Sequence, residues 1–91
     1  MNSNQEQIID RARRDLAQRL AISESGVALG SVEQTEFPDA ALGAAVEDEM
    51  SAQVFTTGLR IRLIANGQTY EYRATERQLR LVNFRGENYR I

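Results

Sequence analysis

The sequence predicts an α+β fold: an N-terminal helix packed on an antiparallel sheet of about four strands, with a C-terminal three-stranded meander. Apolar residues recur at helical spacing before residue 21. Two segments of alternating apolar and polar residues flank Asn66-Gly67, a dipeptide typical of two-residue hairpin turns. A further alternating segment after residue 77 extends this hairpin into a meander. We expect a single α+β domain, 1–91.

The helix is expected over residues 3–21. Ser3 and Glu6 have capping-box spacing, in which each side chain binds a free backbone N–H of the first turn. An apolar stripe at helical period follows, formed by Ile8, Ile9, Ala12, Leu16 and Leu20. Two i,i+4 ion pairs are expected on the polar face: Asp10–Arg14 and Asp15–Arg19.

A strand is expected over residues 27–37, with a bulge at Gly30-Ser31 where the apolar alternation slips by one residue. Pro38 ends this strand. The small acidic segment 38–53 fits either a loop or a short helix. The remaining expected elements are antiparallel strands at 54–65, 68–74 and 78–84 and a polar tail at 85–91.

The Asn66-Gly67 turn also predicts a register. It places Leu63 opposite Tyr70, and a second turn near Thr75-Glu76 then places Tyr72 opposite Leu79. One sheet face becomes apolar, and the helix stripe is expected to cover it. Its members are Leu59, Ile61, Leu63, Tyr70, Tyr72, Leu79 and Leu81. The other face carries Arg60, Arg62, Glu71, Arg73, Gln78 and Arg80.

The chain has no histidine, cysteine or lysine, and all eleven basic residues are arginine. The commonest general base, the thiolate nucleophile, the Schiff-base amine and the usual zinc ligands are therefore missing. We expect no catalytic residue, no metal site, no cofactor and no enzymatic activity. No apolar run is long enough to span a membrane. The polar N-terminus does not resemble a secretory signal, so a cytoplasmic location is expected.

Charge is distributed unevenly along the chain. Residues 21–50 hold seven acidic side chains and no basic one, whereas residues 51–91 hold seven arginines and three glutamates. We call the set Arg60, Arg62, Arg73 and Arg80 the arginine face. We expect it to bind a protein partner with an acidic surface, because a guanidinium group can bind a carboxylate through two parallel hydrogen bonds.

Two other interpretations of this face remain open. The arginines either form a merely solvated surface that prevents edge aggregation, or they are covered by the acidic segment 33–49. The motive for a partner is that Arg60 lies opposite Arg73, while Glu71 is expected to face Arg62 and Arg80 instead. Nucleic acid is not expected as a partner, because the isoelectric point is about 5.1. The chain is expected to be a monomer or a weak homodimer.

Four short segments carry a family resemblance: DLAQRLAIS at 15–23, FPDAALG at 37–43, the spacing from Gln53 to Gly58, and GQTYEYRA at 67–74. Together they resemble a small, functionally uncharacterised bacterial domain family with a (W/F)PDxxLG…GQTYEY pattern. Members of that family often carry Cys-Pro where this chain has Ala44-Ala45, and His where it has Arg73. The resemblance implies no known activity.

These observations favour a non-enzymatic interaction module, either regulatory or an assembly partner, that acts through the arginine face and the loop 38–52. The alternative is a small anionic-ligand binder or minor enzyme that uses arginines and carboxylates. A ligand binder requires a concave pocket lined by several arginines, whereas a module needs only a flat surface or an edge.

Overall fold

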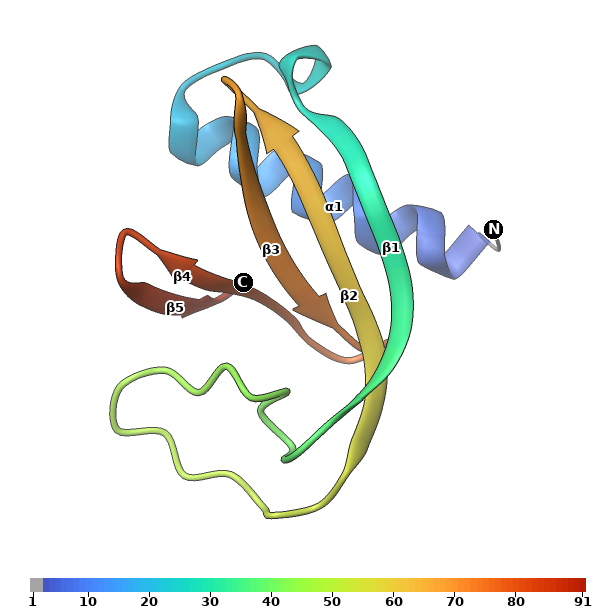
Figure 1. The fold of residues 1–91 in the computed structure, drawn as a ribbon, viewed down its shortest axis with the longest axis vertical. Coiled ribbons are helices and arrows are strands. Elements are labelled where there is room, and N and C mark those ends of the chain that lie inside the picture. The colour runs from blue at the N-terminus through green and yellow to red at the C-terminus, as the bar shows by residue number, and fades with distance from the viewer. Residues whose placement is uncertain (1–2) are drawn as a thin grey trace.

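The computed structural model describes residues 3–91, with side chains from residue 4 onward, so the predicted Ser3 cap lies outside the described side chains. One long helix packs on a five-stranded antiparallel sheet of order β1-β2-β3-β4-β5 (Figure 1). The elements are α1 (Ser3–Leu20), η1 (Glu24–Gly26), β1 (Ala28–Phe37), β2 (Thr56–Ala65), β3 (Gln68–Ala74), β4 (Leu79–Phe84) and β5 (Glu87–Arg90). The α+β class is confirmed, with five strands rather than about four. Within the described residues, no helix has the length and apolar character needed to cross a membrane.

Helix α1 lies across one face of the sheet and buries the predicted stripe there (Figure 1). Ile9, Ala12 and Leu16 are buried, and Ile8 and Leu20 are partly buried against the same core. The sheet contributes the apolar face predicted for the meander, including Ile61, Leu63, Tyr72, Leu79 and Leu81. The apolar stripe of the helix, with a period of 3.6 residues, therefore packs against the apolar face of the strands, with a period of two, in one core.

Strands β2 and β3 pair in the predicted register. Leu63 lies opposite Tyr70, and Ala65 lies opposite Gln68 next to the turn. Asn66 and Gly67 have φ angles of 52° and 76°, the left-handed values that a two-residue type I′ turn requires. The predicted bulge in β1 is also confirmed, because the β1–β2 register shifts between Leu29 and Ser31.

The predicted register between β3 and β4 is wrong by two residues. Tyr72 lies opposite Leu81, not Leu79. The connection is a four-residue turn closed by a hydrogen bond of 2.9 Å from the Thr75 N–H to the Gln78 carbonyl, rather than a two-residue turn. Because side chains alternate with a period of two, this shift leaves the same residues on the same faces.

Residues 85–91 do not form the predicted tail, because most of them belong to strand β5. Arg85 and Gly86 have φ angles of 53° and 87°, so this pair makes a second left-handed turn between β4 and β5. Strand β5 places Arg90 opposite Arg80 and thereby adds another arginine to the arginine face.

Residues 38–55 connect β1 to β2 as an irregular segment, which we call the strap, so the loop alternative holds here (Figure 1). Phe37 is buried on the sheet face opposite α1. Three strap residues are buried as well: Ala41, Leu42 and Ala44. Gly58 makes room for this layer, since a Cβ there would lie 3.3 Å from Phe37 Cε2 and 2.5 Å from the Ala74 carbonyl oxygen. The sheet face opposite α1 is therefore covered in part, by the strap.

Asp15 joins the helix to the sheet. Its Oδ2 accepts hydrogen bonds from Arg19 Nε at 2.8 Å and from the Tyr72 hydroxyl at 2.7 Å. This confirms the predicted pair with Arg19 and shows that Asp15 is not simply on a solvated face. The prediction of an Asp10–Arg14 ion pair is wrong, because Asp10 Oδ1 lies 3.7 Å from Arg13 Nη1 instead.

Candidate functional site

The arginine face lies on the side of the sheet opposite α1, and the structure brings its members together. Arg60 lies opposite Arg73, and Arg73 lies opposite Arg80. With Glu33 opposite Arg60 and Arg90 opposite Arg80, one row of charged side chains crosses all five strands. Like charges directly opposed on a sheet destabilise it, so this row requires nearby carboxylates.

Two glutamates of the sheet neutralise the part of the face on β2 and β3. Glu71 Oε2 lies 2.6 Å from Arg73 Nε and 3.4 Å from Arg60 Nε, and its Oε1 lies 3.8 Å from Arg62 Nε. Glu33 Oε1 accepts a hydrogen bond of 3.0 Å from Arg60 Nη1. The expectation that Glu71 leaves the Arg60–Arg73 pair uncompensated is therefore wrong, because its carboxylate reaches both guanidinium groups.

Arg80 is neutralised by the strap rather than by the sheet. Its Nη1 and Nη2 donate parallel hydrogen bonds of 2.6 Å to the two carboxylate oxygens of Glu49. Arg80 Nε donates to Gln78 Oε1 at 2.7 Å, and Nη1 also lies 3.3 Å from the Ala44 carbonyl oxygen. The two hydrogen bonds from Arg80, together with one from the Val46 N–H, lower the pKa of Glu49 from 4.5 to about 2.

The FPDAALG motif forms the part of the strap that receives Arg73. Asp39 Oδ1 accepts hydrogen bonds from the Ala41 and Gly43 N–H groups at 3.0 and 2.9 Å, which closes a tight turn. Leu42 and Gly43 are left-handed, and the Leu42 carbonyl accepts a bond of 2.9 Å from Arg73 Nη1. A Cβ at Gly43 would lie 2.9 Å from that same nitrogen, so glycine permits the close approach.

The strap removes half of the arginine face from solvent. The Arg62 and Arg60 side chains are 44% and 27% exposed, whereas those of Arg73 and Arg80 are 18% and 3% exposed. The prediction that all four arginines form an open surface is therefore wrong for Arg80. Coverage by the acidic segment, which the sequence left open, is observed at Glu49.

The second half of the strap exposes large apolar side chains. Met50, Val54 and Phe55 are 96%, 53% and 77% exposed, and we call residues 50–55 the apolar segment. Sequence reasoning missed this feature, although an MSAQVF run that fits neither a helical nor a strand period was available as a signal. Exposed apolar groups this close together are a recognised mark of interaction sites.

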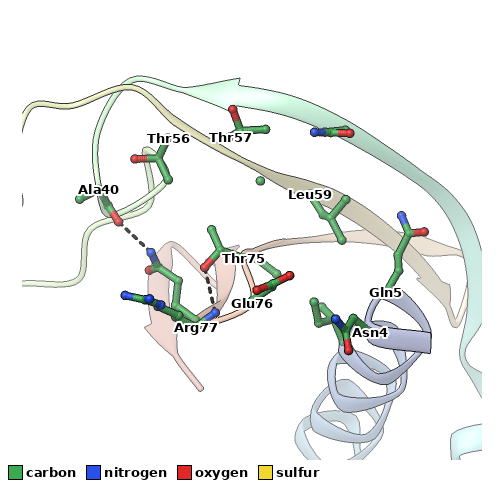
Figure 2. A pocket seen from close by; sticks show the side chains of 14 residues that line it. Asn4, Gln5, Ala40, Thr56, Thr57, Leu59, Thr75, Glu76 and Arg77 are labelled. Atoms are coloured by element: carbon green, nitrogen blue, oxygen red, sulfur yellow. Dashed lines mark hydrogen bonds between the residues drawn. The ribbon is translucent and has the colours of Figure 1, made fainter. Parts of the chain in front are cut away.

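A cleft with a volume of about 690 Å³ lies between the start of α1, the turn after β3 and the start of β2 (Figure 2). It is lined by Asn4, Gln5, Ile8, Gln34, Ala40, Thr56, Thr57, Gly58, Leu59, Ala74, Thr75, Glu76, Arg77 and Gln78. Arg77 is its single arginine, and no member of the arginine face lines it. A second cleft of about 460 Å³ is lined by Ala45, Val46, Glu47, Gly86, Glu87 and Asn88. An anionic-ligand site requires a pocket lined by several arginines, and neither of these two clefts has such a lining.

Among the described side chains, acidic residues do not gather into a group of three or more that could hold a metal ion. No curated protein and no solved structure shows significant similarity to the chain. Residues 9–82 match a family described as a domain of unknown function, DUF8738. This match spans most of α1, the strap and most of the sheet, including the FPDAALG turn and the β2–β3 hairpin. The chain therefore belongs to the DUF8738 family.

Proposed function

We propose that this domain is a non-enzymatic protein-interaction module that contacts its partner through the apolar segment. The observation that carries this proposal is the exposure of Met50, Val54 and Phe55 on a segment held at both ends. Glu49 is fixed to Arg80 on one side, and the chain enters β2 directly after Phe55 on the other. A fixed segment presents apolar side chains with less loss of conformational entropy on binding than a free loop does.

Exposed arginines on the sheet face opposite α1 support a partner that is both apolar and acidic. Arg60 and Arg62 are the members of the arginine face with the most exposed side chains. They offer guanidinium groups to acidic residues of the partner. Exposed rim charges of this kind mainly influence the association rate and its salt dependence, while the apolar centre supplies affinity.

The proposal is tested by partner capture with matched variants. The tagged full chain is used as bait, and captured proteins are quantified by mass spectrometry for the wild type and for the Met50→Ser, Phe55→Ser double variant. The control is Leu29→Ser with Ile64→Ser, which replaces two exposed apolar side chains at the other end of the sheet. We expect recovery to fall about tenfold or more only when the apolar segment is changed. Equal recovery by both double variants contradicts the proposal.

We further propose a bacterial and cytoplasmic setting, supported by the family resemblance, and a monomer or weak homodimer as the working state. Fractionation of source cells with an antibody against the domain tests the location. Sedimentation equilibrium tests the association state.

A further inference from the structure

The first residues of β2 have a strand partner on one side only. Strand β1 runs alongside β2 as far as Thr56, where it pairs with Phe37. Strand β3 ends earlier, with Ala74 opposite Leu59, because the chain then turns toward β4. Residues 56–58 therefore have no strand partner on the β3 side, although Ala74 and Thr75 lie close to Gly58.

Alternation of the hydrogen bonds identifies which backbone groups are left open. A two-residue hairpin begins with a hydrogen-bonded pair, here Ala65 and Gln68, and every second pair is then hydrogen-bonded. Leu59 and Ala74 form such a pair, so the next residue of β2 that points to the β3 side is Thr57. Within the described residues, no backbone hydrogen bond outside the regular ladders involves Thr57. Its N–H and C=O consequently face the missing strand position.

The 690 Å³ cleft occupies this same position (Figure 2). Its walls come from several layers of the molecule: Asn4 and Ile8 from α1, Ala40 from the strap, and the turn that contains Thr75. Thr57 lies on the β2 side of the cleft, and Thr75 lies in the turn on the other side (Figure 2). The cleft therefore continues the line of β3 at the level of the sheet.

The lining of the cleft favours a neutral hydrogen-bonding ligand. It consists mostly of threonine hydroxyl groups, amide side chains and small apolar groups. Its two charged side chains, Glu76 and Arg77, are adjacent and of opposite sign, so they do not select an anion or a cation. The cleft has no aromatic lining residue on which a sugar ring or a base could stack. A peptide main chain, with alternating N–H and C=O groups, matches both the open edge and the neutral walls.

We infer that this cleft accepts a short, extended and uncharged peptide segment of a partner protein, which pairs with the backbone of Thr57 as an added strand. The inference rests on the proposed function in one respect, that the partner is a protein. It adds the kind of contact, main-chain pairing at the start of β2. Phe55 lies two residues before Thr57, so the apolar segment borders one end of the added strand.

A peptide-display experiment tests this inference on the full chain. A library of random heptapeptides is selected against the wild-type domain, and enriched peptides are synthesised and titrated. Thr57→Pro removes the open N–H without removing a hydrogen bond to β1, whereas the isosteric Thr57→Val keeps it. We expect uncharged central residues in the enriched peptides and binding about tenfold weaker to the proline variant only, as for the loss of one backbone hydrogen bond.

Two further measurements keep the test decisive if Thr57→Pro perturbs the fold. Two N-methylated versions of each peptide are compared, one methylated at the odd residues and one at the even residues. Only one of these two sets of N–H groups faces the domain, so only one version should bind the wild type about tenfold more weakly. Hydrogen exchange should show protection of residue 57 on binding. The absence of enriched peptides, affinity unaffected by N-methylation in either register, or protection on the outer edge of β1 overturns the inference. The peptide titration does not alter Met50 or Phe55, so it fails or succeeds separately from the capture test.

Discussion

The Arg80 side chain is 3% exposed and binds the Glu49 carboxylate through two parallel hydrogen bonds of 2.6 Å. The two residues are 31 positions apart, so this pair is a long-range connection between the strap and the centre of the sheet. A guanidinium on β4 is thereby satisfied by a carboxylate from a segment without regular secondary structure. Together with the hydrogen bond from Arg73 to the Leu42 carbonyl, this pair fixes the strap to the sheet.

Replacing Glu49 by Gln should destabilise the fold by about 3 kcal/mol, because removal of one partner leaves the buried Arg80 charge uncompensated. Urea unfolding at neutral pH measures the change. Glu47→Gln is the matched control, because Glu47 is exposed and forms no ion pair in the part of the chain that the structure describes. A loss below about 1 kcal/mol for Glu49→Gln would place the pair in the class of solvated surface ion pairs.

The same carboxylate predicts acid sensitivity. The pKa of Glu49 is lowered from 4.5 to about 2 in the folded chain, mainly by its hydrogen bonds to Arg80. Because the folded pKa lies below the unfolded one, the stabilisation is complete above pH 4.5 and is lost as the pH falls toward 2. Unfolding free energies measured across this range should fall more steeply for the wild type than for Glu49→Gln. Parallel curves for the two proteins would contradict the assignment.

A Cβ at residue 58 should be poorly tolerated. It would meet the Ala74 carbonyl oxygen at 2.5 Å and the Phe37 ring at 3.3 Å, so Gly58→Ala forces the strand or the ring to move. We expect a loss of about 2 kcal/mol, measured by thermal unfolding. Gly26→Ala is the control, because its Cβ meets only Ile22 Cδ1 at an ordinary 3.5 Å, and it should change stability by less than about 0.5 kcal/mol.

Truncation of the leucines in the apolar stripe of α1 should lower the free energy of unfolding by different amounts. Leu16 is fully buried in the core and Leu20 is only partly buried at the end of α1. Leu16→Ala is therefore expected to cost about 3 kcal/mol, and Leu20→Ala about 1 kcal/mol. Denaturant titration of the two variants measures both values. Equal costs would mean that the end of the helix packs as tightly as its centre.

Tyr72 should not ionise in the folded protein at moderately alkaline pH. Burial, and then its hydrogen bond to the Asp15 carboxylate, raise the pKa of the phenol far above its ordinary value of 10. Its contribution to stability is present below pH 10 and is lost as the pH rises beyond it. Tyrosine absorbance during alkaline titration should show one of the three tyrosines ionising only on unfolding, and Tyr72→Phe should remove that step.

The parts of the fold that the sequence predicts correctly are those determined by local chemistry. The Asn66-Gly67 turn fixes the β2–β3 register, and the helical period identifies the stripe of α1. The turn after Ala74 carries no comparable signal, so its length was predicted two residues too short. Strand β5 was missed because its left-handed Arg85-Gly86 turn lacks the Asn or Asp that usually marks such a turn.

The arginine face was identified by alternation alone, but its neutralisation was not. Glu71 reaches diagonally to Arg60 on β2 and along its own strand to Arg73, and both contacts depend on side-chain conformation rather than on strand pairing. The contact of Glu49 with Arg80 depends on how a long irregular segment folds back, and no local pattern encodes that path. The exposed apolar segment follows from the same path, because the side-chain contacts between strap and sheet end at Glu49, and Met50, Val54 and Phe55 beyond it are exposed.

The arginine row has a consequence for how the domain opens. Arg60, Arg73 and Arg80 are direct neighbours across three strands, and Glu49 arrives from outside the sheet. Detachment of the strap would remove the Glu49 carboxylate from these three positive charges. The repulsion between β2, β3 and β4 would then increase as the strap ceased to cover them. Release of the strap and loosening of β4 are therefore coupled events, and the two behave as one cooperative unit even though one of them contains no regular secondary structure.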